Sequence, residues 1–188
     1  MLITASDSQK FLAHVNTVIG KKLDVLDWST NCNNSTNRLV ENEYQFADYI
    51  LTSDLTRGGF IVGDFTGNYE YMRPESDLGR YYKAGVSIRE AVMAMADAER
   101  SFWDAPPPRN DMTANRIKQS LSVLDTAKYA ALSNSIDWNK VPTGDVLNYI
   151  RSFRPDLEQR YYDFRFHYVS NKSFFSWDED SNGFRKVD

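Results

Sequence analysis

The sequence is poor in cysteine, and this scarcity excludes folds that depend on disulfide bonds. Its 188 residues include a single cysteine, Cys32, so no disulfide bond can form within the chain. Small secreted domains held together by disulfides are therefore excluded, and we expect a cytoplasmic location. Cys32 lies in a polar run without a basic neighbour to lower the pKa of its thiol, and we interpret it as a passive loop residue.

Histidine is almost as scarce as cysteine. The chain contains only His14 and His167, too few for a metal site built from several histidines, and no metal or cofactor is expected. His167 shares one side of an alternating segment with Asp163 and Arg165. That arrangement suits general acid–base catalysis if the side lines a cleft, but we interpret it as an exposed polar strand face.

Long apolar runs and a strong charge of one sign are also missing. No stretch approaches the ~18 apolar residues of a membrane span, so no membrane partner is expected. The net charge of −4 argues against a dedicated nucleic-acid-binding protein, whose affinity depends on a basic surface. Glycine-rich phosphate-binding motifs are absent as well, so nucleotide binding has no support from a motif.

The residues that are present have the composition of a globular protein, with 41% hydrophobic and 14% aromatic residues. The length suits one domain. We expect a single α+β domain over residues 1–188, in which prolines at 105–109 separate two lobes and residues 178–188 form a flexible acidic tail. Asp178 to Gly183 resemble the start of a calcium loop, but Arg185 departs from that pattern and we interpret them as a solvated acidic turn.

Apolar residues at helical spacing predict most of the helices. Ser6 and Gln9 have the spacing of a capping box, and so do Ser87 and Glu90. The stripe expected to face the core from the first helix consists of Phe11, Leu12, Val15, Val18 and Ile19. The five helices are expected at about 6–19, 35–52, 87–104, 113–136 and 143–153.

Alternation and turn residues predict the strands. Two short β-rich runs flank a Gly-Asn turn and predict a hairpin near 60–72. Tyr162, Phe164, Phe166 and Tyr168 alternate with polar residues, which predicts a half-buried strand over 160–169. We therefore expect a small antiparallel sheet, formed by the hairpin and this late strand, packed with about five helices.

Aromatic and arginine residues in segments expected at the surface predict a binding site. Such residues dominate the energetics of protein interfaces because they offer a large contact area together with a polar group. The sequence therefore predicts a non-enzymatic intracellular protein that docks on a protein partner. A viral or mobile-element accessory protein, which inhibits a host factor in the host cytoplasm or assists particle assembly, would fit. The predicted binding residues are Tyr69, Tyr71, Arg80, Tyr81, Tyr82, Trp103, Arg109 and Trp138.

An alternative hypothesis is a small enzyme, a hydrolase, transferase or lyase acting on a nucleotide-type ligand. Asp64 and Glu70 flank the turn of the predicted hairpin and could face each other as a catalytic carboxylate pair, together with tyrosines or His167. Convergence of these three residues in one pocket would favour the enzyme, whereas scattered positions would favour the binding protein.

Overall fold

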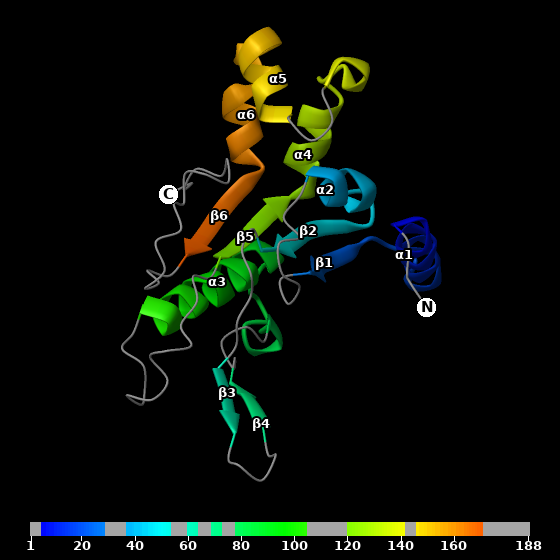
Figure 1. Ribbon diagram of the computed structural model, residues 1–188. Helices are drawn as coiled ribbons and strands as arrows, with labels where there is room; N and C mark the ends of the chain where they lie inside the picture. Colours follow the sequence, from blue (N-terminus) through cyan, green and yellow to red (C-terminus); the bar gives the residue numbers. More distant parts are fainter. Residues whose placement is uncertain are drawn as a thin grey trace.

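A computed structural model describes residues 5–28, 37–53, 60–63, 69–72, 78–104, 120–141 and 146–170. These ranges contain six α-helices and six β-strands, most of them grouped around one sheet (Figure 1). None of the helices in these ranges is long and apolar enough to cross a membrane. The predicted proline break at 105–109 and the predicted acidic tail at 178–188 lie outside the described residues and stay predictions.

The central sheet has four strands in the order β1 (Leu23–Asp27), β2 (Ala47–Thr52), β5 (Ser120–Asp125) and β6 (Arg165–Ser170). β1 runs parallel to β2, whereas β5 runs antiparallel to both β2 and β6. β1, β2 and β6 therefore point the same way, and their carboxyl ends lie along one border of the sheet. We call this border the carboxyl edge.

The predicted hairpin is present but forms a sheet of its own. β3 (Phe60–Gly63) pairs antiparallel with β4 (Tyr69–Met72), and Figure 1 shows the hairpin projecting away from the four-stranded sheet. The α+β fold class is thus confirmed, with a mixed sheet rather than the expected antiparallel one. The late strand pairs with β5, a segment that the sequence pattern assigned to a helix, and not with the hairpin.

Helices cover both faces of the central sheet, and residues of β2 and β5 are buried on both sides. On one face, a first core cluster joins Val92 of α3 to Leu51 and Val123 of the sheet. On the other face, a second core cluster joins Ile50 and Leu124 to residues of four shorter helices. The bounds of these helices are α3 (Ile88–Asp104), α2 (Asn37–Glu43), α4 (Thr126–Ser133), α5 (Val146–Phe153) and α6 (Glu158–Asp163).

Burial on both faces explains why the expected helix over 35–52 is wrong. α2 ends at Glu43 and the chain then enters β2, where neighbouring residues such as Ile50 and Leu51 are both fully buried on opposite faces. A short, continuous apolar run satisfies helical spacing as well as strand spacing. The same ambiguity concealed β5 within the helix expected over 113–136, of which α4 is the part confirmed.

The late strand begins later than expected. α6 extends to Asp163, and the strand begins only at Arg165. Tyr161 and Phe164 are both buried and lie three residues apart, which is helical spacing. The aromatic alternation therefore spans the end of a helix and the start of a strand. Pro155, in the first turn of the preceding 3-10 segment, begins this helical stretch.

Local capping signals were reliable for α3. The backbone N–H of Ser87 donates to Glu90 Oε2 at 2.8 Å, and the backbone N–H of Glu90 donates to Ser87 Oγ at 3.2 Å. This reciprocal pair is the predicted capping box. The hydrogen bonds from Ser87 lower the pKa of the exposed Glu90 carboxyl.

The first helix is confirmed as α1 (Ala5–Ile19), which ends at Gly20 with a φ of +73°. Its predicted core stripe is mostly wrong, because Leu12 is buried whereas Phe11 and Val18 are exposed. α1 lies beside the edge strand β1 and α2, not beneath the sheet, so only a narrow part of its surface meets the core (Figure 1). A helix at the border of a fold buries less than its apolar pattern suggests.

Candidate functional site

At the carboxyl edge, a row of polar residues crosses three strands. The backbone N–H of Trp28 donates to Leu51 O at 2.9 Å, which places Trp28 beside Thr52, and Thr52 pairs with Ser122. Thr52 and Ser122 are fully buried, on the side of the sheet that holds the second core cluster. Within the described ranges the Ser122 hydroxyl has no hydrogen-bond partner, which is unusual for a buried polar group.

Next to this row, a buried carboxylate joins three elements. Glu43, at the end of α2, is only 4% exposed. Its Oε2 accepts a short hydrogen bond from the indole N–H of Trp28, and its Oε1 accepts one from Ser8 Oγ of α1 at 3.0 Å. Each carboxylate oxygen thus has a donor, as a buried charge requires. We call this arrangement the Trp28–Glu43–Ser8 clamp.

One histidine of the chain lies on a strand that ends at this edge. Cys32 follows Trp28 by four residues in the sequence and lies outside the described residues. His167 pairs with Val123 near the carboxyl end of β6. His14 lies on α1. The Asn16 side chain of α1 donates to Phe46 O, just before β2, so this part of α1 lies at the opposite border of the sheet. Of the two histidines, only His167 belongs to a strand that ends at the carboxyl edge.

A second, partly buried carboxylate, that of Glu41, lies between α2 and α4. Tyr129 donates to Glu41 Oε2 at 2.7 Å, and Ser133 Oγ donates to the same oxygen at 3.1 Å. The Trp138 indole N–H in turn donates to Ser133 Oγ at 3.1 Å. Burial first, and then the hydrogen bond to Glu41, raise the pKa of Tyr129 well above its ordinary value of 10.

This raised pKa predicts a specific weakening of the fold in alkali. Below pH 10 both states keep the Tyr129 proton, but above pH 10 the unfolded state loses it first, so stability falls as the pH rises. Between pH 9 and pH 11, the free energy of unfolding should fall by about 1.4 kcal/mol more in the wild type than in Tyr129→Phe. Urea unfolding of both proteins at the two pH values measures this difference. Identical pH dependence would contradict the assignment.

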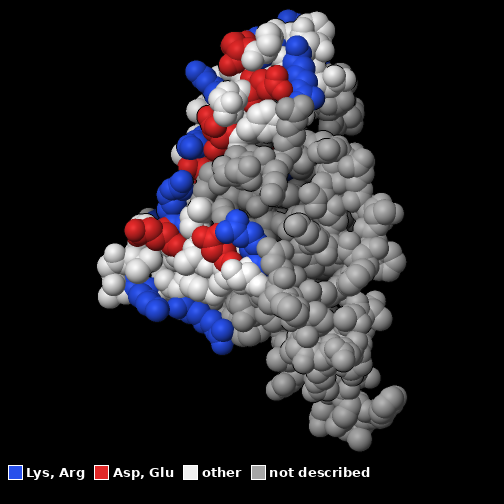
Figure 2. All heavy atoms as spheres, turned by 90° about the vertical axis from the view of Figure 1, so that its left-hand side faces the viewer, with Lys and Arg blue, Asp and Glu red and all other residues white. Residues whose placement is uncertain are grey.

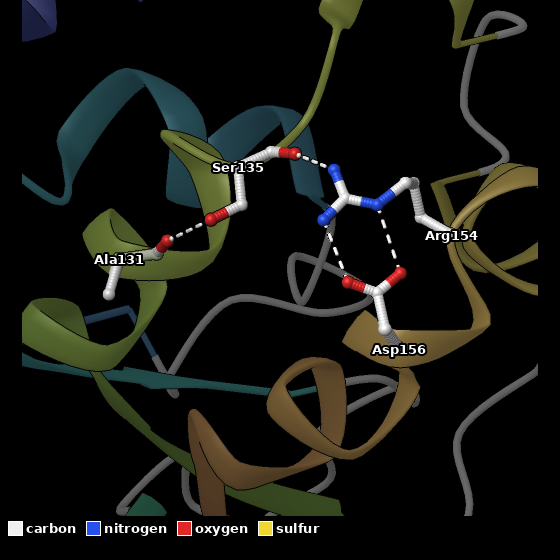
Figure 3. A network of polar contacts seen from close by, with 4 residues as sticks. All are labelled: Ala131, Ser135, Arg154 and Asp156. Atoms are coloured by element: carbon white, nitrogen blue, oxygen red, sulfur yellow. Dashed lines mark hydrogen bonds and ion pairs between the residues drawn. The ribbon is translucent and has the colours of Figure 1, made fainter.

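A third polar network fastens the ends of two helices. Figure 3 shows Arg154 forming two parallel hydrogen bonds to Asp156, at 2.9 and 2.7 Å, while its third nitrogen donates to Ser135 O at 2.8 Å. Ser135 Oγ donates to Ala131 O in α4. The hydrogen bond from Arg154 lowers the pKa of the exposed Asp156 carboxyl. The network joins the end of α5 to the end of α4, which is a structural role.

Surface charge on the described part of the face in Figure 2 is mixed. Basic and acidic side chains alternate over it, and neither sign forms a large field. The described residues include surface ion pairs, such as Arg151 with Glu158 at 2.8 Å. Pairs of this kind contribute little to stability because water screens them.

The predicted binding residues are not gathered into one patch where their side chains are described. Tyr81 packs against the first core cluster, whereas Trp138 packs against the second, on the opposite face of the sheet. Tyr82 is exposed, and its hydroxyl donates to Asp24 at 3.3 Å. Partial burial is the main cause that raises the pKa of Tyr82, and the neighbouring Asp24 carboxylate raises it further. Arg80 is exposed. Tyr69 and Tyr71 lie on β4 and Trp103 in the last turn of α3, and Arg109 lies outside the described residues.

The residues of the alternative enzyme hypothesis are not brought to one place. Glu70 lies on β4, opposite Val62 in the hairpin sheet, whereas His167 lies on β6 in the central sheet. Asp64 lies outside the described residues. Over the described ranges, no group of three or more histidine, cysteine, aspartate or glutamate side chains is placed to hold a metal ion. The calcium-loop pattern from Asp178 to Gly183 also lies outside these ranges.

Comparison with known proteins gives a result for structure alone. No protein-family model matches the sequence, and no curated protein matches it either. Two solved structures of similar length share its architecture. A clostripain from Bacteroides thetaiotaomicron, in complex with a peptide inhibitor, is 11% identical with a TM-score of 0.54, over 90% of this chain and 76% of that one. A B. fragilis cysteine protease is 12% identical with a TM-score of 0.58, over 96% and 82%. The chain shares the fold of these two solved structures.

A longer protein shows the same likeness. A secreted C11 cysteine protease from B. thetaiotaomicron, in complex with an irreversible peptide inhibitor, is 13% identical with a TM-score of 0.58. The alignment covers 97% of this chain but only 55% of that protein. At these identities the property held in common is the fold, since the sequences have diverged almost completely.

The shared fold corrects the prediction of a non-enzymatic binding protein. The three solved structures described above are a clostripain and two cysteine proteases, and their descriptions do not support a viral accessory protein or an inhibitor. The sequence-based argument used the scarcity of cysteine and histidine only to exclude sites. A cysteine–histidine pair remained possible in principle, but it was set aside because the sequence shows no partner for Cys32. The predicted protein partner and cytoplasmic location stay predictions.

Proposed function

We propose that the chain is a thiol-dependent peptide hydrolase. One observation supports this most strongly: the fold is that of cysteine proteases, in a chain that contains a single cysteine. A cysteine protease needs one thiolate nucleophile, so the composition leaves Cys32 as the residue that must supply it. This proposal replaces the interpretation of Cys32 as a passive loop residue.

The chemistry requires a base near the thiol. An imidazole that takes the thiol proton produces the thiolate, which attacks the peptide carbonyl carbon, and the protonated imidazole then protonates the departing amine. Water subsequently hydrolyses the thioester and regenerates the thiol. His167 is the base that we propose, because β6 ends at the carboxyl edge that β1 also approaches.

The dimensions of the sheet are compatible with this pair. β1 and β6 are separated by β2 and β5, a lateral distance of about 14 Å at ~4.8 Å per strand. The four residues from Trp28 to Cys32 can span about 13–14 Å when extended. An extended chain of this length is about as long as that distance.

Replacing the thiol tests the proposal directly. Cys32→Ser should reduce hydrolysis of a mixed peptide library at least ~10³-fold, as does loss of the nucleophile in other covalent hydrolases. His167→Ala should cause a loss of similar size, whereas the matched control His14→Ala should leave the rate unchanged. The irreversible peptide inhibitor type that binds the C11 protease should add its mass to the wild type and not to Cys32→Ser. A wild type that cleaves no peptide, or a Cys32→Ser variant with full activity, would overturn the proposal.

A further inference from the structure

We propose that the outward face of α1 is a contact surface between two copies of this chain, which associate through an antiparallel pair of α1 helices. Phe11 is 66% exposed and Val18 is 71% exposed, so most of each apolar side chain is open to solvent. The proposal goes beyond the hydrolase activity and does not depend on it. Four apolar residues at helical spacing form this face, and we call them the α1 stripe: Phe11, Val15, Val18 and Ile19.

The other side of α1 fixes the direction in which the stripe points. Leu12 is the buried residue of the helix. Three polar side chains of α1 also donate hydrogen bonds to α2 and to the residues that lead into β2. Each bond measures 3.0 Å, and the pairs are Ser8 with Glu43 Oε1, Gln9 with Asn42 O, and Asn16 with Phe46 O. The helix therefore meets the fold largely through polar groups and turns its apolar stripe outward, at the border of the molecule (Figure 1).

A stripe of this kind indicates a contact surface. Single exposed apolar residues are ordinary on soluble proteins, but neighbouring ones along one helix face expose a continuous apolar surface to water. A second copy fits the stripe because its spacing is symmetric. Phe11 and Val18 are seven positions apart and Val15 lies close to midway between them. A two-fold axis beside Val15 therefore places Phe11 of one copy opposite Val18 of the other, and Val18 opposite Phe11.

Charges beyond the two ends of the stripe complement each other about the same axis. Asp7 lies four positions before Phe11, Lys22 lies four positions after Val18, and both charged residues are exposed. The axis that pairs Phe11 with Val18 thus also brings Asp7 of one copy opposite Lys22 of the other, and a two-fold contact contains this pair twice. A parallel arrangement would instead bring like charges together. The charges therefore favour the antiparallel one.

The contact area predicts weak association. A helix of 15 residues is about 22 Å long and about 10 Å wide, so one helix pair buries well below the ~1,200 Å² of a stable complex. We therefore expect a dimer that forms only as the protein concentration rises. Sedimentation equilibrium of the full chain should show a monomer at about 1 µM and a growing dimer fraction towards about 1 mM. A chain that stays monomeric over this range would overturn the proposal.

Phe11→Asp should raise the dimer dissociation constant about 10- to 10²-fold, because the substitution removes an apolar contact at two places. Phe153→Asp is the matched control, since Phe153 is 70% exposed but lies on α5, and it should leave dimerisation unchanged. Circular dichroism at about 1 µM checks that the variants are folded. Val18→Asp changes the stripe at a second place and should weaken the dimer as Phe11→Asp does. Equal weakening by Phe153→Asp, or unchanged association of folded Phe11→Asp and Val18→Asp, would place the contact elsewhere and overturn the proposal.

Charge reversal tests the antiparallel register. At low salt, Asp7→Lys and Lys22→Asp should each raise the dissociation constant about 3- to 10-fold, because each places like charges opposite one another twice. The double variant Asp7→Lys/Lys22→Asp restores opposite charges across an antiparallel contact and should recover dimerisation to within about twofold of the wild type. A double variant weaker than both single variants is the result expected of a parallel contact and would overturn the antiparallel arrangement.

A lipid surface is the competing occupant of the stripe, because an amphipathic helix flanked by lysines can also lie on anionic lipid. Vesicles of phosphatidylserine provide the probe. We expect the wild-type chain to remain in the supernatant when these vesicles are sedimented. Co-sedimentation that Phe11→Asp abolishes, by a wild type that stays monomeric without lipid, would assign the stripe to a membrane surface and overturn the proposal.

Discussion

Replacing Val92 with aspartate is expected to leave the chain unfolded. Val92 lies on α3 with a fully buried side chain, packed against Leu51 and Val123 of the sheet. An aspartate there would bury a carboxyl group between two apolar layers, where the loss of its hydration is costly. Such substitutions cost more than about 4–5 kcal/mol, against a total stability of about 5–15 kcal/mol for a typical domain. Circular dichroism and solubility of the purified variant measure the loss.

Val18→Asp is the matched control for this prediction. The same substitution on α1 places the carboxylate at a side chain that is 71% exposed, so the free energy of unfolding should change by no more than about 0.5 kcal/mol. The sequence pattern placed both Val18 and Val92 on the core-facing sides of their helices. Only the structure shows that Val18 is exposed and Val92 is buried. Unfolding of Val18→Asp, or a folded Val92→Asp, would show that the helix faces are assigned incorrectly.

Features that depend on neighbouring residues could be predicted from the sequence. The capping box at Ser87 and Glu90 needs only two side chains three residues apart, and both hydrogen bonds are present. Gly20 ends α1 in the left-handed region, where glycine has no steric penalty. The hairpin of β3 and β4 likewise follows from its turn residues.

Features that depend on distant pairing could not be predicted. β2 and β5 are short apolar strands whose residues are buried on both faces, so their patterns do not differ from those of buried helices. These segments are strands because β2 pairs with β5, for example at Tyr49 and Asp125, and β5 pairs with β6. The paired residues are more than 40 positions apart in the sequence. No local signal reports such partners. The carboxyl edge exists only because of this strand order, so the candidate site was invisible until the sheet was known.

The predicted binding surface stays a prediction, although two of its aromatic residues pack on the core for a related reason. Tyr81 and Trp138 were expected in a binding site because their segments contain polar and turn residues, yet each packs on a core cluster from outside. Aromatic side chains are long enough to reach the core from a loop while their polar atoms remain hydrogen-bonded, as the Trp138 indole is to Ser133. Sequence position therefore does not decide whether an aromatic residue closes a core or recognises a partner.

The later start of β6 matters most for stability at Phe164. This residue lies between the end of α6 and the start of β6, fully buried. Its ring meets Tyr129 edge-on at 5.0 Å and Tyr161 at 5.7 Å, and the Arg165 guanidinium lies 5.6 Å from the ring centre. Its carbonyl accepts the backbone N–H of Asp125 at 2.7 Å, so the residue joins α4, α6 and the sheet.

Phe164→Ala should therefore destabilise the fold by about 3–5 kcal/mol and lower Tm by about 10 °C, because the surrounding rings are held by separate elements and cannot collapse into the cavity. Phe153→Ala is the matched control, since Phe153 also contacts a tyrosine, Tyr149 at 5.5 Å, but is 70% exposed. That variant should lose less than about 1 kcal/mol. Calorimetry of the two variants measures the difference. Equal losses would show that Phe164 does not lie in the core between α6 and β6.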